Sequence, residues 1–155
     1  DCTVCTSTDP RDTRTRCAAY VRAGDLGILI DTGPDVRSQI LREGIDRVDA
    51  VCYTHYHFDH LVGIDDLRPF FFHHRAPMPC FANEETAAVM RSNYDYIFGA
   101  DPYPGAARVR LEEVTDPFPI ESRYDDGAPS VQVEPIRLLH GDMPVTATAS
   151  AASPT

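Results

Sequence analysis

The stretch "RVDAVCYTHYHFDHLVG", residues 47–63, changes from an apolar run to a cluster of histidines within a few positions. Its first part, which contains "AVCY", is as short and as apolar as a strand that is buried in a sheet. Its second part places three histidines and one aspartate in the six residues 55–60. Four residues of this type, directly after an apolar strand, favour a metal-binding loop over an ordinary polar turn.

The spacing inside the loop suggests two metal sites. His55 and His57 stand two residues apart, so on an extended backbone their imidazoles project from the same side and can reach one metal ion. Asp59 and His60 are adjacent, and a turn at the end of the strand would direct both inward as a second pair of ligands. This is the arrangement of two-metal hydrolases, whose ions lie about 3.5–4 Å apart and flank the reacting centre.

The segments around this loop predict strands that alternate with helices. Residues 17–24 and 26–33 are rich in strand-forming residues and are joined by a Gly-Asp turn, which favours a hairpin. After Pro34, apolar residues recur at helical spacing until Gly44, which ends the predicted helix. Further strands are expected at 47–55, 77–83, 107–114 and 130–140, with a short helix at 61–68 and a longer helix opened by Asn83. This order predicts a layered α/β protein.

The two ends of the chain differ in composition from its middle. Residues 1–16 are polar and lack periodicity, which predicts a loop that carries two cysteines. After Val145 the chain contains no large apolar residue, so residues 146–155 are predicted to form a low-complexity tail without a packed strand or helix. Residues 1–145 are therefore expected to form one domain, which at this length can bury a substantial core.

Charge and hydropathy exclude several classes of partner. The formal net charge of -10 opposes broad binding to nucleic acid, because such binding depends on neutralising phosphates with basic residues. No apolar run reaches the roughly 18 residues that a membrane span requires, so no membrane partner is expected. The N-terminus lacks the layout of a signal peptide, so a cytoplasmic location is expected.

The five cysteines are too few and too irregular for a disulfide framework. Cys52 and Cys80 lie in apolar runs and are expected to be small core residues. Cys2 and Cys5 have a spacing that lets two thiolates reach one zinc ion, but they supply only half of a tetrahedral site. An ordinary loop is the alternative interpretation.

Two motifs carry a resemblance to a known family. "THYHFDH" matches the H-x-H-x-D-H signature of the metallo-β-lactamase superfamily, and "LIDTGPD" resembles that family's strand ending in an Asp-Thr-Gly turn. The resemblance implies that the first metal is bound by His55 and His57, and the second by Asp59 and His60. It also implies His140, at a later strand end, as the third histidine of the first site. Asp31 would orient the ligand loop as a hydrogen-bond acceptor.

Three longer segments resemble a narrower branch. "DCTVCTSTDPRDTRTR", "DTGPDVRSQILREG" and "HYHFDHLVGIDDLRPF" together look like the phosphoribosyl cyclic phosphate phosphodiesterase-like branch. That branch carries a structural zinc on a cysteine-rich N-terminal insertion, in which Cys2 and Cys5 match two of the thiolates. The resemblance therefore implies an additional structural zinc besides the two catalytic ions.

The resemblance also implies that the chain is incomplete. The family fold is an αβ/βα sandwich, and its C-terminal half supplies the aspartate that bridges both metals and the last histidine of the second site. The chain is thus expected to form the N-terminal half of the sandwich. A half-sandwich would leave apolar surface uncovered, so association into a homo-oligomer is expected.

The function implied is metal-dependent hydrolysis of a small (cyclic) phosphate ester, with zinc or manganese as the metal. A metal-bound hydroxide would attack phosphorus, and Asp59 would position the water or accept its proton. Arg68 is a candidate for holding the phosphate by a bidentate contact, and a solvated surface arginine is the alternative. Other hypotheses are hydrolysis of a lactone, a thioester or a tRNA precursor on the same site, or a truncated metal-binding module without catalysis.

Overall fold

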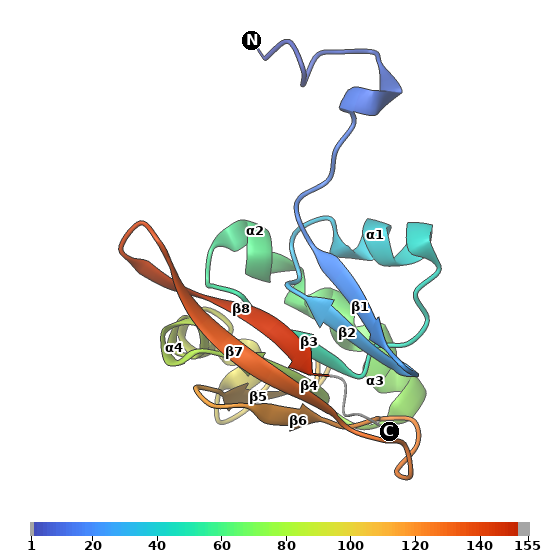
Figure 1. The fold of residues 1–155 in the computed structure, drawn as a ribbon, viewed down its shortest axis with the longest axis vertical. Coiled ribbons are helices and arrows are strands. Elements are labelled where there is room, and N and C mark those ends of the chain that lie inside the picture. Colours follow the sequence, from blue (N-terminus) through green and yellow to red (C-terminus); the bar gives the residue numbers. More distant parts are fainter. Residues whose placement is uncertain (1, 152–155) are drawn as a thin grey trace.

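Two β-sheets form the framework of the protein, and helices cover the outer face of the larger sheet (Figure 1). The structure, a computed structural model, describes residues 2–151, of which 73, 150 and 151 are described by their backbone alone. The strands are β1 (Ala19–Ala23), β2 (Leu26–Ile30), β3 (Ala50–Cys52), β4 (Met78–Ala82), β5 (Val109–Glu113), β6 (Phe118–Ile120), β7 (Val131–His140) and β8 (Met143–Ala151). The helices are α1 (Val36–Glu43), α2 (Phe58–Leu61), α3 (Arg68–His74), α4 (Glu84–Asn93) and α5 (Asp95–Phe98), with 3-10 turns η1 (Pro10–Asp12) and η2 (Val62–Leu67).

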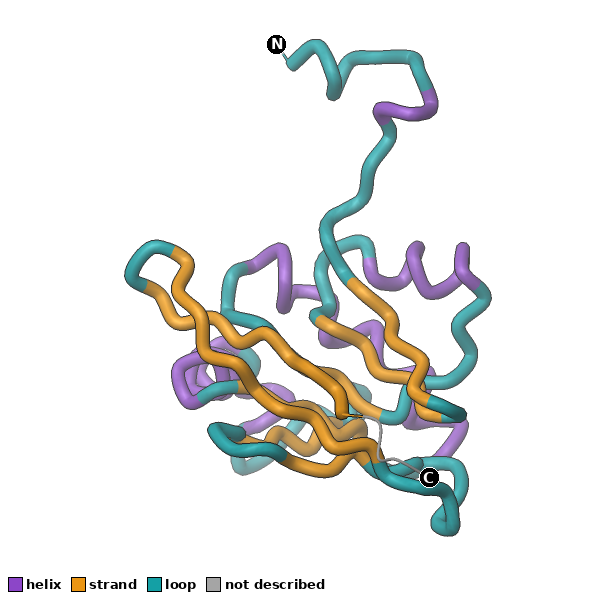
Figure 2. The backbone as a smooth tube through the Cα atoms, viewed as in Figure 1, coloured by secondary structure: helices purple, strands orange, loops and turns teal. Residues whose placement is uncertain are grey.

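The larger sheet has the strand order β1-β2-β3-β4-β5, and the smaller sheet has the order β6-β7-β8. β1 runs antiparallel to β2, whereas β2, β3, β4 and β5 are parallel to one another. The smaller sheet is antiparallel throughout. Figure 2 shows the N-terminal segment as a loop, interrupted by η1, that extends away from this framework. The predicted α/β layers are therefore confirmed.

The central strand β3 is buried on both faces, because alternate residues of a strand point to opposite sides of the sheet. Val51 packs into the cluster beneath the helices. Ala50 and Cys52 pack into a second cluster with Phe81, against the smaller sheet. Burial raises the pKa of the Cys52 thiol to about 12, so Cys52 acts as a small core residue, as expected. Cys80 is likewise fully buried.

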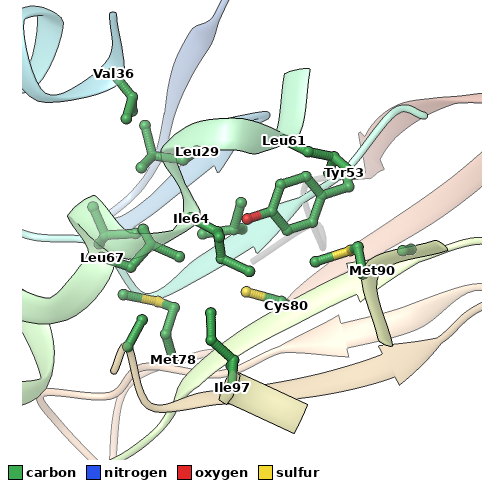
Figure 3. Close-up of a cluster of buried hydrophobic side chains, with 14 of the residues drawn as sticks. Leu29, Val36, Tyr53, Leu61, Ile64, Leu67, Met78, Cys80, Met90 and Ile97 are labelled. Atoms are coloured by element: carbon green, nitrogen blue, oxygen red, sulfur yellow. The ribbon is translucent and has the colours of Figure 1, made fainter. Parts of the chain in front are cut away.

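The main core lies between the larger sheet and its helices (Figure 3). Tyr53 and Met78 contribute from the sheet side, Ile64 and Leu67 from η2, and Met90 from α4, and each is at most 1% exposed. Burying a side chain of this kind contributes about 1.5–3 kcal/mol relative to exposure. This packing fixes η2 against the face of the larger sheet, and with it the histidine loop that precedes η2 in the chain.

The locally encoded elements agree with the sequence. The hairpin of β1 and β2 turns at Gly24, whose φ of 61° suits glycine. α1 ends at Gly44, which has a left-handed conformation and whose N–H bonds the carbonyls of Ile40 and Leu41. The side chain of Asn83 accepts a hydrogen bond from the Thr86 N–H and so begins α4, as predicted.

The expectation that residues 146–155 form no packed element is wrong for residues 146–151. These residues belong to β8, which pairs with β7 in a continuous antiparallel register from His140↔Met143 to Gln132↔Ala151. The Thr146 N–H also donates to the Thr54 carbonyl, at 2.8 Å. The strand is held by these backbone hydrogen bonds and by its β-branched residues rather than by large apolar side chains. Residues 152–155 lie outside the described part of the chain.

A buried carboxylate ties together the opposite ends of the strands. Asp49 is fully buried and accepts hydrogen bonds from the Gly27 N–H at 2.8 Å, from Arg47 Nε at 2.8 Å and from the Arg123 N–H at 2.9 Å. A buried carboxylate destabilises the fold unless hydrogen bonds and an opposite charge compensate for the loss of hydration, so the removal of any of these partners would be costly. Asp49 therefore connects β2, β3 and the segment after β6 at the edge that faces away from the histidine loop.

One face of the smaller sheet remains open. Ile136 and Leu138 of β7 are 41% and 50% exposed, and their cross-strand partners are Ala147 and Val145. Opposed residues of paired strands share a face, so these side chains form one apolar strip. The expected homo-oligomer remains a prediction that rests on this strip. None of the helices in the described residues is both long and apolar enough to cross a bilayer.

Candidate metal centre

The site lies where β2 and β3 end side by side. Because these strands are parallel, with Ile30 paired to Cys52, their carboxyl ends open at the same edge of the sheet. β2 continues into the turn that starts at Asp31, and β3 continues through Thr54 into the histidine loop. Ligand sites of α/β sheets form at this edge.

Asp31 organises the loop from a strained backbone position. It is 3% exposed and has a φ of 65°, which is uncommon for a residue other than glycine and costs about 1–3 kcal/mol. Its Oδ1 accepts from the Thr54 N–H at 2.8 Å, and its Oδ2 accepts from the Thr54 hydroxyl at 2.8 Å. The same Oδ2 lies 2.7 Å from His60 Nδ1. The structure therefore places Asp31 where an orienting acceptor is expected, and that contact leaves His60 Nε2 for a ligand.

Thr54 sets the orientation of His55. The Thr54 hydroxyl donates its proton to Asp31, so it accepts from His55 Nδ1, which lies 2.9 Å away. In this tautomer the lone pair is on His55 Nε2. Burial lowers the pKa of His55, and the nearby His60 and His57 lower it further. His55 is thus held neutral, which is the form that binds a metal.

The imidazoles named from the sequence gather around His55. His55 Nε2 lies 3.1 Å from His57 Nδ1. The ring centroids of His55 and His60 are 4.1 Å apart. His140, from the end of β7, brings its ring centroid to 5.6 Å from that of His57 and 6.0 Å from that of His55. The hairpin of β7 and β8 therefore delivers a histidine that is distant in sequence to the loop.

Asp59 lies at the exposed side of this cluster. Its Oδ2 is 4.0 Å from His60 Nε2, and its side chain is 40% exposed. The second expected pair of ligands is therefore also juxtaposed. Asp59 additionally forms an ion pair with Arg16, whose Nη1 lies 3.8 Å from Oδ2. Arg16 is the last residue of the segment "DCTVCTSTDPRDTRTR", but the sequence predicted no role for its side chain.

Two glycines let the Asp-Thr-Gly turn and the histidine loop touch. A Cβ on Gly33 would lie 2.4 Å from the Asp59 carbonyl oxygen, and a Cβ on Gly63 would lie 2.4 Å from the Gly33 carbonyl oxygen. Two backbone hydrogen bonds join the segments, from the Thr32 N–H to the His60 carbonyl and from the Gly63 N–H to the Thr32 carbonyl, both 2.8 Å. Side chains at these two positions would separate Asp31 from the histidines that it contacts.

The donor set suits a divalent transition metal. Nitrogens that bind one tetrahedral zinc at about 2.0–2.1 Å lie roughly 3.3 Å from each other, so the spacing of 3.1 Å between His55 Nε2 and His57 Nδ1 fits a shared ion. Within residues 2–151, no three His, Cys, Asp or Glu side chains enclose one metal position. The structure thus brings the expected ligands together in pairs and leaves their metal roles as predictions.

The remaining predicted residues lie apart from this cluster. Cys2 and Cys5 are exposed, and the Cys5 N–H donates to Cys2 Sγ at 3.4 Å. This hydrogen bond lowers the pKa of the Cys2 thiol, which favours the thiolate that binds zinc. Arg68 begins α3 with an exposed side chain, which forms no hydrogen bond or ion pair with another described residue. The structure therefore supports no particular role for Arg68.

Several known proteins resemble the chain. It is 36% identical to a diphosphatase of the PhnP family, whose crystal structure it matches with a TM-score of 0.78 over 97% of this chain and 54% of that one. It is 39% identical to an octanoyltransferase of Porphyromonas gingivalis over 93% of this chain and 28% of that protein. Human tRNase Z, short form, shares the fold with a TM-score of 0.58 at 18% identity. The chain therefore spans about half, or less, of the length of these relatives.

The family follows from the extent of the sequence match. The sequence model of the beta-lactamase superfamily domain matches residues 27–153, which include most of β2, the strands β3 to β8 and the whole histidine loop, whereas β1 precedes the match. The resemblance of "THYHFDH" and "LIDTGPD" to this family is therefore confirmed over most of the chain, and the chain belongs to the beta-lactamase superfamily.

Proposed function

We propose that this chain carries the metal-ligand loop of a metal-dependent hydrolase that cleaves a small phosphate ester. The observation that carries the proposal is the set of contacts around Asp31. That carboxylate holds His60 directly and His55 through Thr54, so that both imidazoles present Nε2 at the open edge of the sheet. Asp31 also has a left-handed backbone conformation, and strained backbone positions cluster at functional sites.

The choice of a phosphate substrate rests on a relative. The diphosphatase of the PhnP family is similar over nearly the whole of this chain, at 36% identity. Its name describes cleavage at phosphorus, which agrees with the small phosphate ester expected from the three N-terminal segments. The octanoyltransferase matches over only 28% of its length, so its named activity supports no acyl-transfer function here.

The roles of the residues follow from their positions. His55, His57 and His140 would hold one divalent ion, and Asp59 and His60 would hold a second. Such ions supply a nucleophile from water at neutral pH and neutralise the charge that develops on phosphorus. The partly exposed Asp59 carboxylate would position the attacking water and accept its proton. Three imidazoles favour zinc over manganese at the first site, whereas an aspartate with a histidine accepts either metal.

The test combines metal analysis with turnover in the protein at its full natural length. We expect two ions per chain besides any structural zinc, and hydrolysis of bis-p-nitrophenyl phosphate that falls to the background rate in His57→Ala. His74→Ala is the matched control, because His74 lies on α3 and its ring packs on Tyr124, away from the loop. At most one ion, with no turnover after zinc or manganese is added, would favour a metal-binding module without catalysis.

A second candidate is the phosphodiester of a tRNA precursor. A ribonuclease Z of Bradyrhizobium diazoefficiens is 40% identical over 60 residues, which are 37% of this chain and 20% of that protein. The net charge of -10 opposes this substrate, because RNA binding requires basic surface. Cleavage of a tRNA precursor at a rate above that of small cyclic phosphates, lactones and thioesters would select this candidate.

A further inference from the structure

The segment before β1, residues 2–16, forms an N-terminal arm. Its last two residues, Thr15 and Arg16, are hydrogen-bonded to α1 and its N-cap beside the histidine loop. The Arg16 N–H donates to Asp35 Oδ2 at 2.7 Å, and the Arg16 carbonyl accepts from Gln39 Nε2 at 2.7 Å. Gln39 Nε2 also donates to the Thr15 hydroxyl oxygen, at 2.9 Å. These bonds fix the backbone of Arg16 although most of the arm extends away from the body (Figure 1).

Asp35 makes this tether at the expense of its usual role. It stands at the N-cap of α1, where an aspartate ordinarily accepts a hydrogen bond from the first turn, yet it makes no side-chain cap bond. Its Oδ2 accepts from Arg16 instead. The carboxylate therefore positions the arm rather than the helix.

The tether brings the Arg16 side chain to the rim of the metal centre. Its Nη1 lies 3.8 Å from Asp59 Oδ2. A Cβ on Gly33 would lie 3.7 Å from the Arg16 Cβ, so the arm crosses the Asp-Thr-Gly turn in van der Waals contact. Among the ion pairs of residues 2–151, this pair alone joins an arginine to one of the expected metal ligands.

The guanidinium keeps its donors available. A separation of 3.8 Å is too long for a hydrogen bond, and the side chain is 64% exposed. An exposed ion pair of this kind does little to hold Asp59 in place. Arginine presents five N–H donors in a planar fork that matches two oxygens of a phosphate.

We infer that Arg16 is a substrate-binding residue of this site, and that its guanidinium binds the non-bridging oxygens of an anionic phosphate substrate. The inference rests on the proposed function for the identity of the substrate. Arg16 approaches from a segment outside both sheets, so the N-terminal arm forms part of the substrate site. The arm thereby gains a role besides holding Cys2 and Cys5.

The test uses the zinc-loaded protein at its full natural length and two readouts, the affinity for inorganic phosphate by calorimetry and the KM for bis-p-nitrophenyl phosphate. Loss of a bidentate charge-assisted contact should raise both constants about tenfold in Arg16→Gln, with a smaller change in kcat. In Arg16→Lys both constants should lie between those of the wild type and Arg16→Gln, because lysine keeps the positive charge but lacks the planar pair of donors. Arg14→Gln removes the same charge from the same arm, and its phosphate affinity and KM should equal those of the wild type. The zinc content of every variant should also equal that of the wild type.

The two readouts separate this inference from the proposed function. The wild type could bind phosphate without hydrolysing the diester, while Arg16→Gln, and no other variant, binds phosphate more weakly. In that case Arg16 binds phosphate and the hydrolase proposal fails. If the wild type hydrolyses the diester and Arg16→Gln behaves like the wild type, the inference is overturned while the function stands. A wild type without phosphate affinity, an equal loss in Arg14→Gln, or a loss of zinc in Arg16→Gln would also overturn it.

Discussion

At the scale of single residues, the candidate metal centre depends on Asp31. Its carboxylate contacts Thr54 and His60, and through the Thr54 hydroxyl it determines the tautomer of His55. One side chain thus orients imidazoles of both expected metal sites. The energy stored in its backbone is compensated by hydrogen bonds that only a carboxylate in this position can accept.

Asp31→Asn should weaken metal binding without unfolding the protein. The Asp31 carboxylate accepts from three donors, the Thr54 N–H, the Thr54 hydroxyl and His60 Nδ1. In asparagine one of the two oxygens becomes an N–H₂ group, which cannot accept a hydrogen bond, so the three contacts cannot all form and His60 loses its fixed orientation. Loss of such a supporting contact typically costs about 10–100-fold in metal affinity, which a competition titration with a zinc chelator would measure. Asp66→Asn, in η2 after the loop, is the control. Equal zinc affinity in Asp31→Asn and the wild type would show that Asp31 does not orient the ligands.

At the scale of elements, the site depends on where strands end and on what holds their opposite ends together. The histidine loop follows β3 at the carboxyl edge of the parallel strands β2 and β3, and Asp49 connects β3 to its neighbours at the other edge. Arg47, one partner of Asp49, also lies with its guanidinium 4.6 Å from the centre of the Tyr124 ring. The polar network at this edge and the apolar strand β3 therefore act together to hold the sheet in register.

Asp49→Asn should destabilise the whole domain. It removes the charge that pairs with Arg47 and leaves the Gly27 and Arg123 N–H groups with a poorer acceptor in a fully buried position. Breaking a buried, hydrogen-bonded pair on one side costs about 3–5 kcal/mol of unfolding free energy, which urea denaturation would measure. Asp46→Asn, exposed and three residues earlier, should change stability by less than about 0.5 kcal/mol. Equal midpoints for the two variants would contradict the role given to Asp49.

At the scale of the whole molecule, the smaller sheet presents an uncovered apolar strip. Ile136 and Leu138 lie on it together with Val145 and Ala147 from β8. The side of the sheet that faces the larger sheet is closed by Phe118, Ile120 and Val133. Contiguous exposed apolar surface is typical of faces that bind another surface, so association through this strip remains a prediction.

Residues 1–155 expressed alone should therefore self-associate. Light scattering should report a mass above 17.2 kDa, and the double variant Ile136→Arg with Leu138→Arg should shift the mass toward that of one chain. Leu41→Arg is the matched control, because Leu41 is 67% exposed but lies on α1 at the other side of the molecule. A monodisperse wild-type monomer would show that the strip does not drive association.

The sequence by itself determined the local elements and the chemistry of the loop. The spacing of His55, His57 and His60, the cap at Asn83 and the stop at Gly44 are all properties of a few consecutive residues. Hydrophobic periodicity and capping act over one or two turns or along one strand, so they can be read without knowing what packs against them. The family signature is local in the same sense.

Only the tertiary structure decided which distant segments meet. The contact of Arg16 with Asp59 depends on the path of the arm across the Asp-Thr-Gly turn, which no periodicity records. The strand β8 forms despite its small side chains, because β7 supplies a complete ladder of backbone partners. His140 reaches the loop by the same hairpin. Such contacts follow from the order and register of strands, and these are set by packing across the whole domain rather than by neighbouring residues.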